Sequence, residues 1–194
     1  KNMSGFDGHW QRIRHWLAND KLPVVLAGVG ILLTLRVVGT GLVFDDYIQR
    51  DILLRQAGWT LKDAFVPGRG MFSFFSGNPE QTKLAMESGI FPWWTFGELR
   101  MAFLRPLTEI THWLDYRLWP DSPALMHAHS LLWFGIMIFT AAVLYRKLMT
   151  PMWVAGLAAF LYAVDDAHGV PAGWLANRNT LIAAVFGFMT LIIH

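Results

Sequence analysis

The stretch PVVLAGVGILLTLRVVGTGLVF, residues 23–44, decides the class of this protein, because it is apolar throughout except for Arg36. As a helix it would rise about 1.5 Å per residue and reach across a hydrocarbon core of about 30 Å. Basic residues precede it, and the acidic pair Asp45-Asp46 follows it at once. A signal peptide would have a shorter apolar core followed by a small-residue cleavage site. The stretch therefore predicts an uncleaved transmembrane helix.

The composition of the whole chain supports a membrane protein. Hydrophobic residues make up 54% of the 194 residues and charged residues only 15%, against about a quarter in soluble domains. The net charge of +2 is spread along the chain, which argues against a nucleic-acid partner. The absence of cysteine excludes a disulfide scaffold and any site built on a thiolate. We expect membrane lipids as the surroundings.

Three further apolar runs follow, over residues 124–145, 151–164 and 180–194. A short basic linker beginning at Arg146-Lys147 joins the first two of these runs, which predicts a tight helical hairpin. The last run is still apolar at His194, so we expect a helix that is cut off there. The predicted fold class is all-α: a polytopic membrane bundle of about four transmembrane helices.

Orientation follows from the basic residues in the short flanks, which favour the cytoplasm. Residues 1–22 and the linker after residue 145 are therefore predicted to be cytoplasmic, and residues 45–123 and 165–179 to lie outside. We expect an integral, multi-pass protein of a bacterial inner membrane with a cytoplasmic N-terminus. The two acidic pairs then share the non-cytoplasmic side.

The long outer segment, residues 45–123, is too patterned to be a linker. Residues 47–56 predict a short amphipathic helix, and residues 67–79 predict a loop rich in turn signals. Residues 95–118 predict an amphipathic helix, kinked or restarted at Pro106 and lying at the membrane surface. Its apolar positions are Leu99, Phe103, Leu107, Ile110, Leu114 and Leu118.

Two features near the first helix could carry chemistry. Asp45 and Asp46 are either a polar stop at the interface or a general base or cation ligand at the depth of a lipid headgroup. Arg36 would lie about 12–14 Å deeper along the same helix. A buried arginine at that depth faces either a phosphate or a structural carboxylate partner.

A second cluster lies in the segment DDAHGVPAGWLANRN, residues 165–179. Asp165, Asp166 and His168 could bind a divalent metal, although such a set is weakly specific. The same residues with Arg178 would also suit an anionic phospho-donor, with a carboxylate handling a proton. His127 opens the second apolar run, where a histidine is usually a helix-end hydrogen bonder. No organic cofactor is expected, since dinucleotide and phosphate-loop motifs are absent from the sequence.

Three segments taken together resemble a known family. LVFDDY (42–47), LRPLTEITHWLDYRLWPDSPALMH (104–127) and DDAHGVPAGWLANRNTL (165–181) are similar to the membrane portion of GT-C glycosyltransferases. The similarity is closest to O-mannosyltransferases that carry tetratricopeptide repeats. The order and spacing of the three segments agree with that family.

The resemblance implies an inverting sugar transfer from a polyprenyl- or dolichyl-phosphate donor on the outer face. Asp45 or Asp46 would match the catalytic acid of the family's first outer loop. The residues that match positions around the donor site are Arg105, His127, His168, Trp174 and Arg178. The chain departs from the family at Asp165-Asp166 and Val170, where the family often has His-Pro and an acidic residue. The sequence also ends before the family's later helices and repeats.

Two functions from different classes remain open. In a glycosyltransferase, or its N-terminal portion, Asp45 or Asp46 would deprotonate the acceptor while Arg105, Arg178 and Arg36 hold the donor phosphate. In a non-catalytic membrane subunit descended from the same fold, these residues would only support a scaffold for other membrane subunits. A transporter would need an internal repeat that the sequence lacks. If the first helix and the loop after the third pack together, we expect the two acidic pairs to share one polar cavity that Arg105 and Arg178 also line.

Overall fold

The computed structural model describes residues 3–55 and 59–194, which fall into two compact units. The helical unit comprises Lys1–Val43 and Ser122–His194, and the inserted unit comprises Phe44–Asp121. Helices account for 70% of the chain and strands for 4%. The predicted predominance of helix is confirmed, and a small sheet is added that the sequence did not predict.

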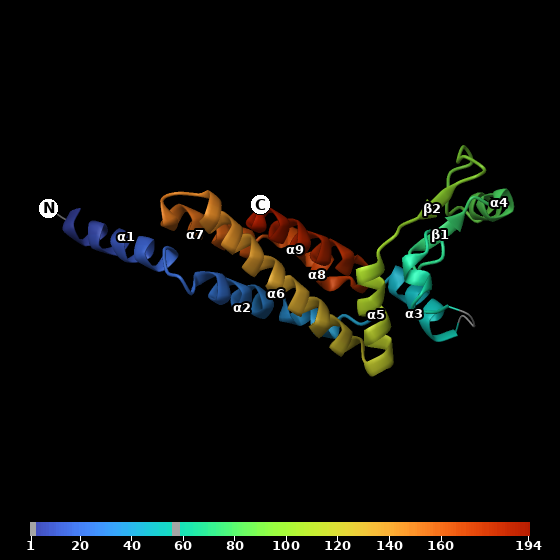
Figure 1. Cartoon of the computed structure of the whole chain (residues 1–194), viewed down its shortest axis with the longest axis horizontal. Helices are drawn as coiled ribbons and strands as arrows, with labels where there is room; N and C mark the ends of the chain where they lie inside the picture. Colours follow the sequence, from blue (N-terminus) through green and yellow to red (C-terminus); the bar gives the residue numbers. More distant parts are fainter. Residues whose placement is uncertain (1–2, 56–58) are drawn as a thin grey trace. The chain divides into compact units, whose positions relative to one another are not determined.

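The helical unit contains the apolar runs of the sequence (Figure 1). Its α-helices and 3-10 helices (η) are α1 (Met3–Leu17), α2 (Leu22–Thr34), η1 (Leu35–Gly39), α6 (Pro123–Leu148), α7 (Met152–Ala163), η3 (Asp166–His168), α8 (Gly169–Gly173), η4 (Leu175–Asn177) and α9 (Arg178–Ile193). Proline near the start of both α2 and α6 suits the first helical turn, where its missing N–H is not needed.

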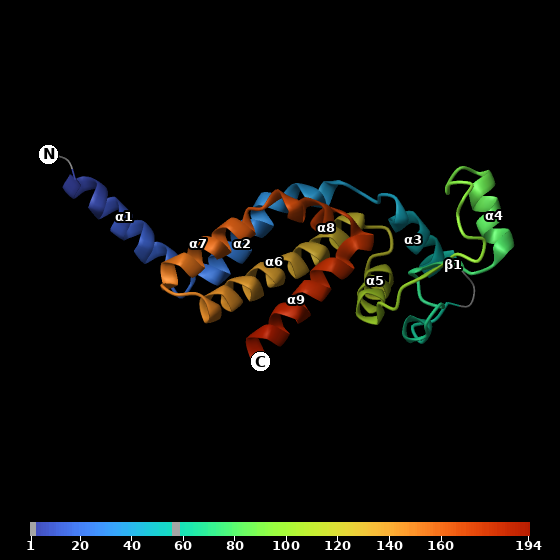
Figure 2. The same cartoon turned by 90° about the horizontal axis from the view of Figure 1, so that it is seen from above.

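Helix α6 is the centre of this unit and runs between α2 and α9 (Figures 1 and 2). Leu26 of α2, Phe134 and Ile138 of α6, and Leu181 of α9 are almost fully buried in one apolar core. Helices α2 and α6 approach closely at Gly135 of α6, where an added Cβ would lie 2.6 Å from Cδ1 of Ile31 in α2. Small residues at such contacts are typical of helices that pack inside membranes.

Among the residues that the structure describes, three helices are long and apolar enough to span a membrane. They are Leu22–Gly39, Pro123–Leu148 and Leu175–Ile193. These helices make the chain compatible with an integral membrane protein. The run predicted over residues 151–164 forms only the 12-residue helix α7, which rises about 18 Å, well short of about 30 Å.

The ends of two helices differ from the prediction. The first span ends at Gly39 rather than at residue 44, because Gly41 adopts a left-handed conformation with φ of 73° that breaks the helix. Arg36 is therefore an exposed residue in the last turn of the span, and the continuous helix to the acidic pair on which its predicted depth rested is not present. The last span begins at Leu175 rather than at residue 180, which extends it to 19 residues.

The two segments predicted to be cytoplasmic lie at the same end of the helical unit. Arg146, at the end of α6, donates hydrogen bonds to the carbonyl of Asn19 (2.9 Å) and to Oδ1 of Asp20 (2.6 Å). Arg14 of α1 lies over the rings of Trp10 and Trp153, which fastens α1 to α7. The end of α6 therefore meets the segment that precedes α2.

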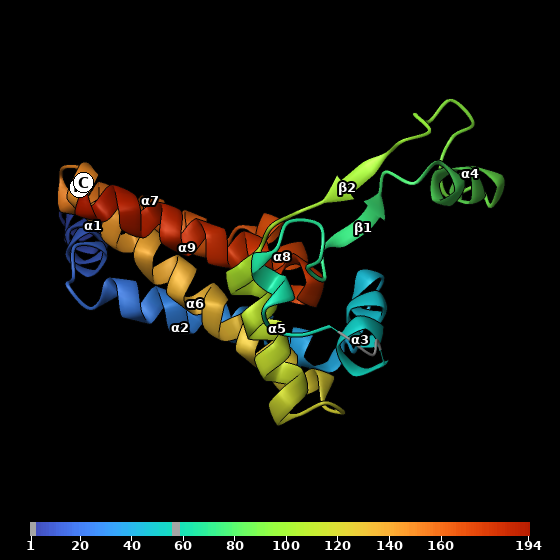
Figure 3. The same cartoon turned by 45° about the vertical axis from the view of Figure 1, so that its right-hand side comes forward.

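The inserted unit is a mixed structure of short elements (Figure 3). They are α3 (Asp45–Arg55), η2 (Asp63–Phe65), β1 (Ser73–Ser76), α4 (Pro79–Glu87), β2 (Arg100–Ala102) and α5 (Pro106–Leu118). The helix predicted over residues 47–56 is confirmed by α3 up to Arg55; residue 56 lies outside the described part. The helix begins two residues earlier, because carboxylates in a first turn are favoured by the helix dipole.

Two predictions for this unit are partly wrong. The loop expected over residues 67–79 contains β1, and residues 95–105 are not helical but include β2, which pairs antiparallel with β1. Only α5 is helical within the segment 95–118, since Pro106 starts this helix rather than kinking a longer one. The apolar spacing before Pro106 is too short to distinguish helix from strand.

Helix α5 buries its polar side and exposes its leucines. Thr108, Glu109, Thr111, His112 and Asp115 are buried, whereas Leu107 and Leu118 are 49% and 56% exposed. The predicted amphipathic pattern is therefore present in α5, and its polar face contacts the inserted unit through Glu109, which bonds to Met71, and through His112, whose ring packs near Phe72.

Candidate functional site

The candidate base Asp45 lines a cavity of about 470 Å³ within the inserted unit. The other lining residues are Ile48, Ser73, Phe74, Phe75, Ile90 and Met101. Asp45 stands at the start of α3 and is half-buried, whereas Asp46 is only 1% exposed. In the first turn of α3, the carboxylate of Asp45 therefore faces a largely apolar cavity, whereas that of Asp46 is buried.

A bulge in β1 shapes the wall of this cavity. Ser73 pairs with Ala102 and Phe75 pairs with Met101, so the register shifts by one residue between them. Such a bulge redirects side chains that would otherwise alternate strictly between two faces. Three consecutive residues, Ser73 to Phe75, consequently line this cavity and also a second one of about 620 Å³.

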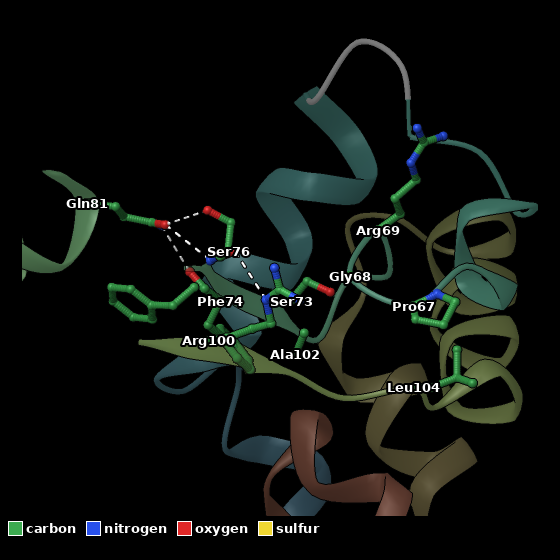
Figure 4. A pocket seen from close by; sticks show the side chains of 11 residues that line it. Pro67, Gly68, Arg69, Ser73, Phe74, Ser76, Gln81, Arg100, Ala102 and Leu104 are labelled. Carbon is green, nitrogen blue, oxygen red and sulfur yellow. Dashed lines mark hydrogen bonds between the residues drawn. The ribbon is translucent and has the colours of Figure 1, made fainter. Parts of the chain in front are cut away.

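The second cavity has a basic and hydroxylic lining (Figure 4). Arg100 donates from Nε to the carbonyl of Ser76 (3.3 Å), and Gln81 accepts from both the backbone and the hydroxyl of Ser76. In Figure 4 the side chain of Arg69 extends away from Arg100. The two guanidinium groups therefore do not converge on one point, and this cavity does not form a double-arginine phosphate site.

Arg105, which the family resemblance places near the donor, lies immediately before α5. Its guanidinium carbon is 4.8 Å from the ring centre of Phe72 and 4.7 Å from that of Phe103. Partial burial lowers the pKa of Arg105, but arginine remains a cation at neutral pH. The two rings hold a positive charge in place at the N-terminal end of α5.

Glu109 is an unusual residue of the inserted unit that the sequence reasoning missed. Its side chain is fully buried, and Oε2 accepts a hydrogen bond from the backbone N–H of Met71 at 3.0 Å. Burial raises the pKa of Glu109 to about 7; the bond from Met71 opposes this rise and the charge of Asp63 adds to it. In the sequence, the only sign of this residue was that Glu109 lies three positions after Pro106, which could start a helix.

In the helical unit, Arg178 joins the start of α9 to the start of α6. It is fully buried, and its Nε donates to Oγ of Ser130 while Nη2 donates to the carbonyl of Met126, both at 2.9 Å. Nη1 lies 3.5 Å from Nδ1 of His129. These contacts give Arg178 a structural role; the donor-binding role implied by the family stays a prediction.

His127 is also fully buried and acts at the same end of the helical unit. Its Nε2 lies 2.7 Å from the carbonyl oxygen of Gly41 and 3.2 Å from Oγ1 of Thr40. The imidazole therefore ties the turn after η1 to α6. This agrees with the interpretation of His127 as a hydrogen bonder near a helix end.

The second acidic cluster is dispersed. Asp165 accepts from the N–H of Ala167 as the cap of η3, and Asp166 is exposed. His168 lies 2.8 Å from the carbonyl of Tyr162 through Nε2. Within residues 3–55 and 59–194, no three His, Asp or Glu side chains are grouped so that they could hold a metal ion. The alternative in which Asp165, Asp166 and His168 share a metal is therefore not supported.

The remaining predicted site residues, Trp174 and Arg36, lie in different parts of the helical unit. Trp174 is half-buried directly before η4, and Arg36 is exposed at the end of the first span. The pair Asp45-Asp46 belongs to the inserted unit and Asp165-Asp166 to the helical unit. A cavity shared by the two pairs stays a prediction.

Comparison with known proteins does not add a family. The chain matches no protein-family model, no curated protein and no solved structure. In its described part the fold is a helical protein with three helices long and apolar enough to span a membrane, and with an inserted unit that carries a largely apolar cavity lined by Asp45.

Proposed function

We propose that the chain is a membrane-integrated glycosyltransferase, or the N-terminal portion of one, that uses a polyprenyl- or dolichyl-phosphate sugar donor. The observation that carries this proposal is the position of Asp45, which follows a possible membrane span in sequence and lines a largely apolar cavity. We place this cavity on the non-cytoplasmic face of a bacterial inner membrane, with the N-terminus in the cytoplasm. A carboxylate in such surroundings can meet both a lipid-borne donor and a hydroxylic acceptor.

In the proposed reaction, Asp45 or Asp46 accepts the proton of an acceptor hydroxyl. The acceptor oxygen attacks the anomeric carbon, and the bond from that carbon to the phosphate oxygen breaks. The electron pair leaves with the polyprenyl phosphate, and the configuration of the sugar is inverted. No oxidant or organic cofactor is required.

The leaving phosphate needs a positive charge near the reacting atoms. Arg105 is the best candidate in the inserted unit, because Phe72 and Phe103 hold its guanidinium in place and leave its N–H donors at the edges of the group. Arg36 is exposed and can adapt to a headgroup. Arg178 is a weaker candidate, since α6 already uses its donors.

The test is transfer or hydrolysis of a polyprenyl-phosphate sugar carrying a radioactive sugar, using the chain reconstituted in vesicles. Replacing the catalytic carboxylate, Asp45→Asn or Asp46→Asn, should lower the rate by about 10²- to 10⁴-fold while donor binding is retained. The matched control is Asp121→Asn, because the Asp121 side chain is 88% exposed and forms only a surface ion pair with Arg50. Equal rates for all three variants would refute the assignment of the base.

The second candidate function is a non-catalytic scaffold subunit. The contacts of Arg178 with Ser130 and Met126 support it, because they occupy donors of an arginine expected at the donor site. A scaffold would neither bind nor cleave the labelled donor, yet would copurify with other membrane subunits. The same reconstitution therefore separates the two functions.

A further inference from the structure

The loop between α4 and β2 presents an unusual group of exposed aromatic side chains. Its sequence, GIFPWWTFG over residues 89–97, contains no charged residue. Trp93 is 83% exposed, Trp94 69%, Phe96 71% and Ile90 67%. Soluble surfaces rarely gather this much apolar area at one place without a partner.

The loop is a defined structure rather than a loose connection. Gly89, with φ of 75°, ends α4, and the N–H groups of Ile90 and Phe91 both donate to the carbonyl of Ala85. Thr95 closes the tip with two hydrogen bonds to the carbonyl of Pro92, from its N–H at 3.0 Å and from its hydroxyl at 2.7 Å. The backbone therefore fixes the direction in which the tip points.

The aromatic rings are ordered by contacts among themselves. Trp93 and Trp94 pack edge to face with ring centres 5.4 Å apart, and Phe91 packs on Phe75 of β1 at 5.0 Å. The inner ring thus holds the loop on the sheet, while the two indoles project outward (the loop can be followed in Figure 3). Exposed rings that are already ordered lose little conformational entropy when a partner covers them.

We propose that residues 90–96 form an anchor that inserts into the interfacial region of a lipid bilayer. Indole rings favour this region, because their apolar body and N–H group suit the boundary between acyl chains and headgroups. The absence of charge from Gly89 to Gly97 removes the main cost of insertion.

The connectivity of the chain favours a bilayer over any other partner. The inserted unit runs from Phe44 to Asp121, and the segments on both sides of it lead directly into possible membrane spans, Leu22–Gly39 and Pro123–Leu148. A unit tethered at both ends in this way stays within reach of the membrane surface. The inference rests on these spans and not on the proposed transferase activity.

The anchor would also set the position of the Asp45 cavity. Ile90, at the base of the loop, lines that cavity together with Asp45. Insertion of the neighbouring tryptophans would therefore hold the wall of the cavity formed by Ile90 close to the membrane interface.

The test uses the full chain in proteoliposomes with an environment-sensitive fluorophore on single cysteines, which is practical because the chain has no cysteine. The label replaces Trp93 at the tip (Trp93→Cys). A positive control carries it at Leu132→Cys on the exposed side of α6, and a matched control carries it at Lys62→Cys, an exposed site of the inserted unit. We expect nitroxides attached to lipid to quench the labels at positions 93 and 132, and aqueous iodide to quench the label at position 62.

Each other outcome overturns the proposal in a recognisable way. If the label at position 93 behaves like the one at position 62, the loop lies in water. If its emission is shifted to the blue but lipid nitroxides do not quench it, protein covers the loop. If lipid nitroxides also do not quench the label at position 132, α6 does not lie in the bilayer, and the membrane spans on which the proposal rests are refuted.

A pair of loop variants tests the chemistry of the anchor. With a label at Phe96→Cys, replacing Trp93 and Trp94 by serine should abolish quenching by lipid nitroxides, whereas replacing both by phenylalanine should preserve it. Both pairs of substitutions fall on exposed side chains, so folding should be retained. Quenching that survives both serine substitutions would refute insertion through the indoles.

Discussion

The contact between Gly70 and Glu109 makes Gly70→Ala the most informative single substitution in the inserted unit. A Cβ added at Gly70 would lie 2.8 Å from the carboxylate carbon of Glu109, closer than real Cβ contacts allow. The carboxylate would have to move. It would then lose the hydrogen bond that its Oε2 accepts from the N–H of Met71 at 3.0 Å. A typical hydrogen bond contributes about 1 kcal/mol and overpacking costs about 1–3 kcal/mol, so we expect a loss of about 2–4 kcal/mol.

Amide hydrogen exchange of the full chain measures this loss locally. A tenfold change in exchange corresponds to about 1.4 kcal/mol, so protection of the Met71 amide should fall by about 30- to 1,000-fold. Gly97→Ala is the matched control, because an added Cβ there would have nothing within 4 Å.

The double variant isolates the contact. In a Glu109→Ala background the carboxylate is gone, so adding Gly70→Ala should cost at least about 1 kcal/mol less than it does in the native chain. Unchanged protection of Met71 in Gly70→Ala, or an equal cost in both backgrounds, would refute the reasoning.

Two further predictions concern buried charged residues. Because burial raises the pKa of Glu109 from 4.5 to about 7, the folded inserted unit binds more protons than the unfolded chain between these values. The contribution of Glu109 to stability should therefore be greatest below pH 4.5 and should fall by about 3 kcal/mol as the pH rises through 7, and Glu109→Gln should remove this dependence in urea titrations at several pH values. Arg178→Lys keeps the charge but cannot reproduce the fork that bonds to Ser130 and to the carbonyl of Met126, so thermal unfolding in detergent should occur at a temperature several degrees lower. An unchanged unfolding temperature would show that these bonds contribute nothing to stability.

The apolar runs could be predicted from sequence because hydrophobicity along one segment is a local property. The run that contains Arg36 and the run that ends at Arg146 are each recognisable without knowledge of their neighbours, and both form possible spans. The basic residues at their ends predicted a shared cytoplasmic side, which stays a prediction; the bonds from Arg146 to Asn19 and Asp20 bring these two ends together. The exact ends were less predictable, because Gly41 stops the first span by its backbone conformation alone.

For the candidate site, the sequence identified residue types, whereas tertiary structure decided which neighbours each side chain has. Asp45 and Asp46 look equivalent in sequence, yet one lines a cavity and the other is buried. Arg178, which the family resemblance places near the donor, donates a hydrogen bond to a carbonyl 52 residues away in the chain. Such partners are set by packing between distant segments and leave no local pattern.

The sequence by itself determined that this chain has helices apolar enough to cross a membrane, because the cost of exposing apolar residues to water depends on composition over a short length. Only the tertiary structure decided that residues 100–102 pair as a strand with β1 and that Glu109 is buried against Met71, 38 residues earlier. It also decided that the tryptophans of the loop point outward. Strand pairing and burial are properties of two segments in contact, and the energy that selects one partner over another exists only once the chain has folded.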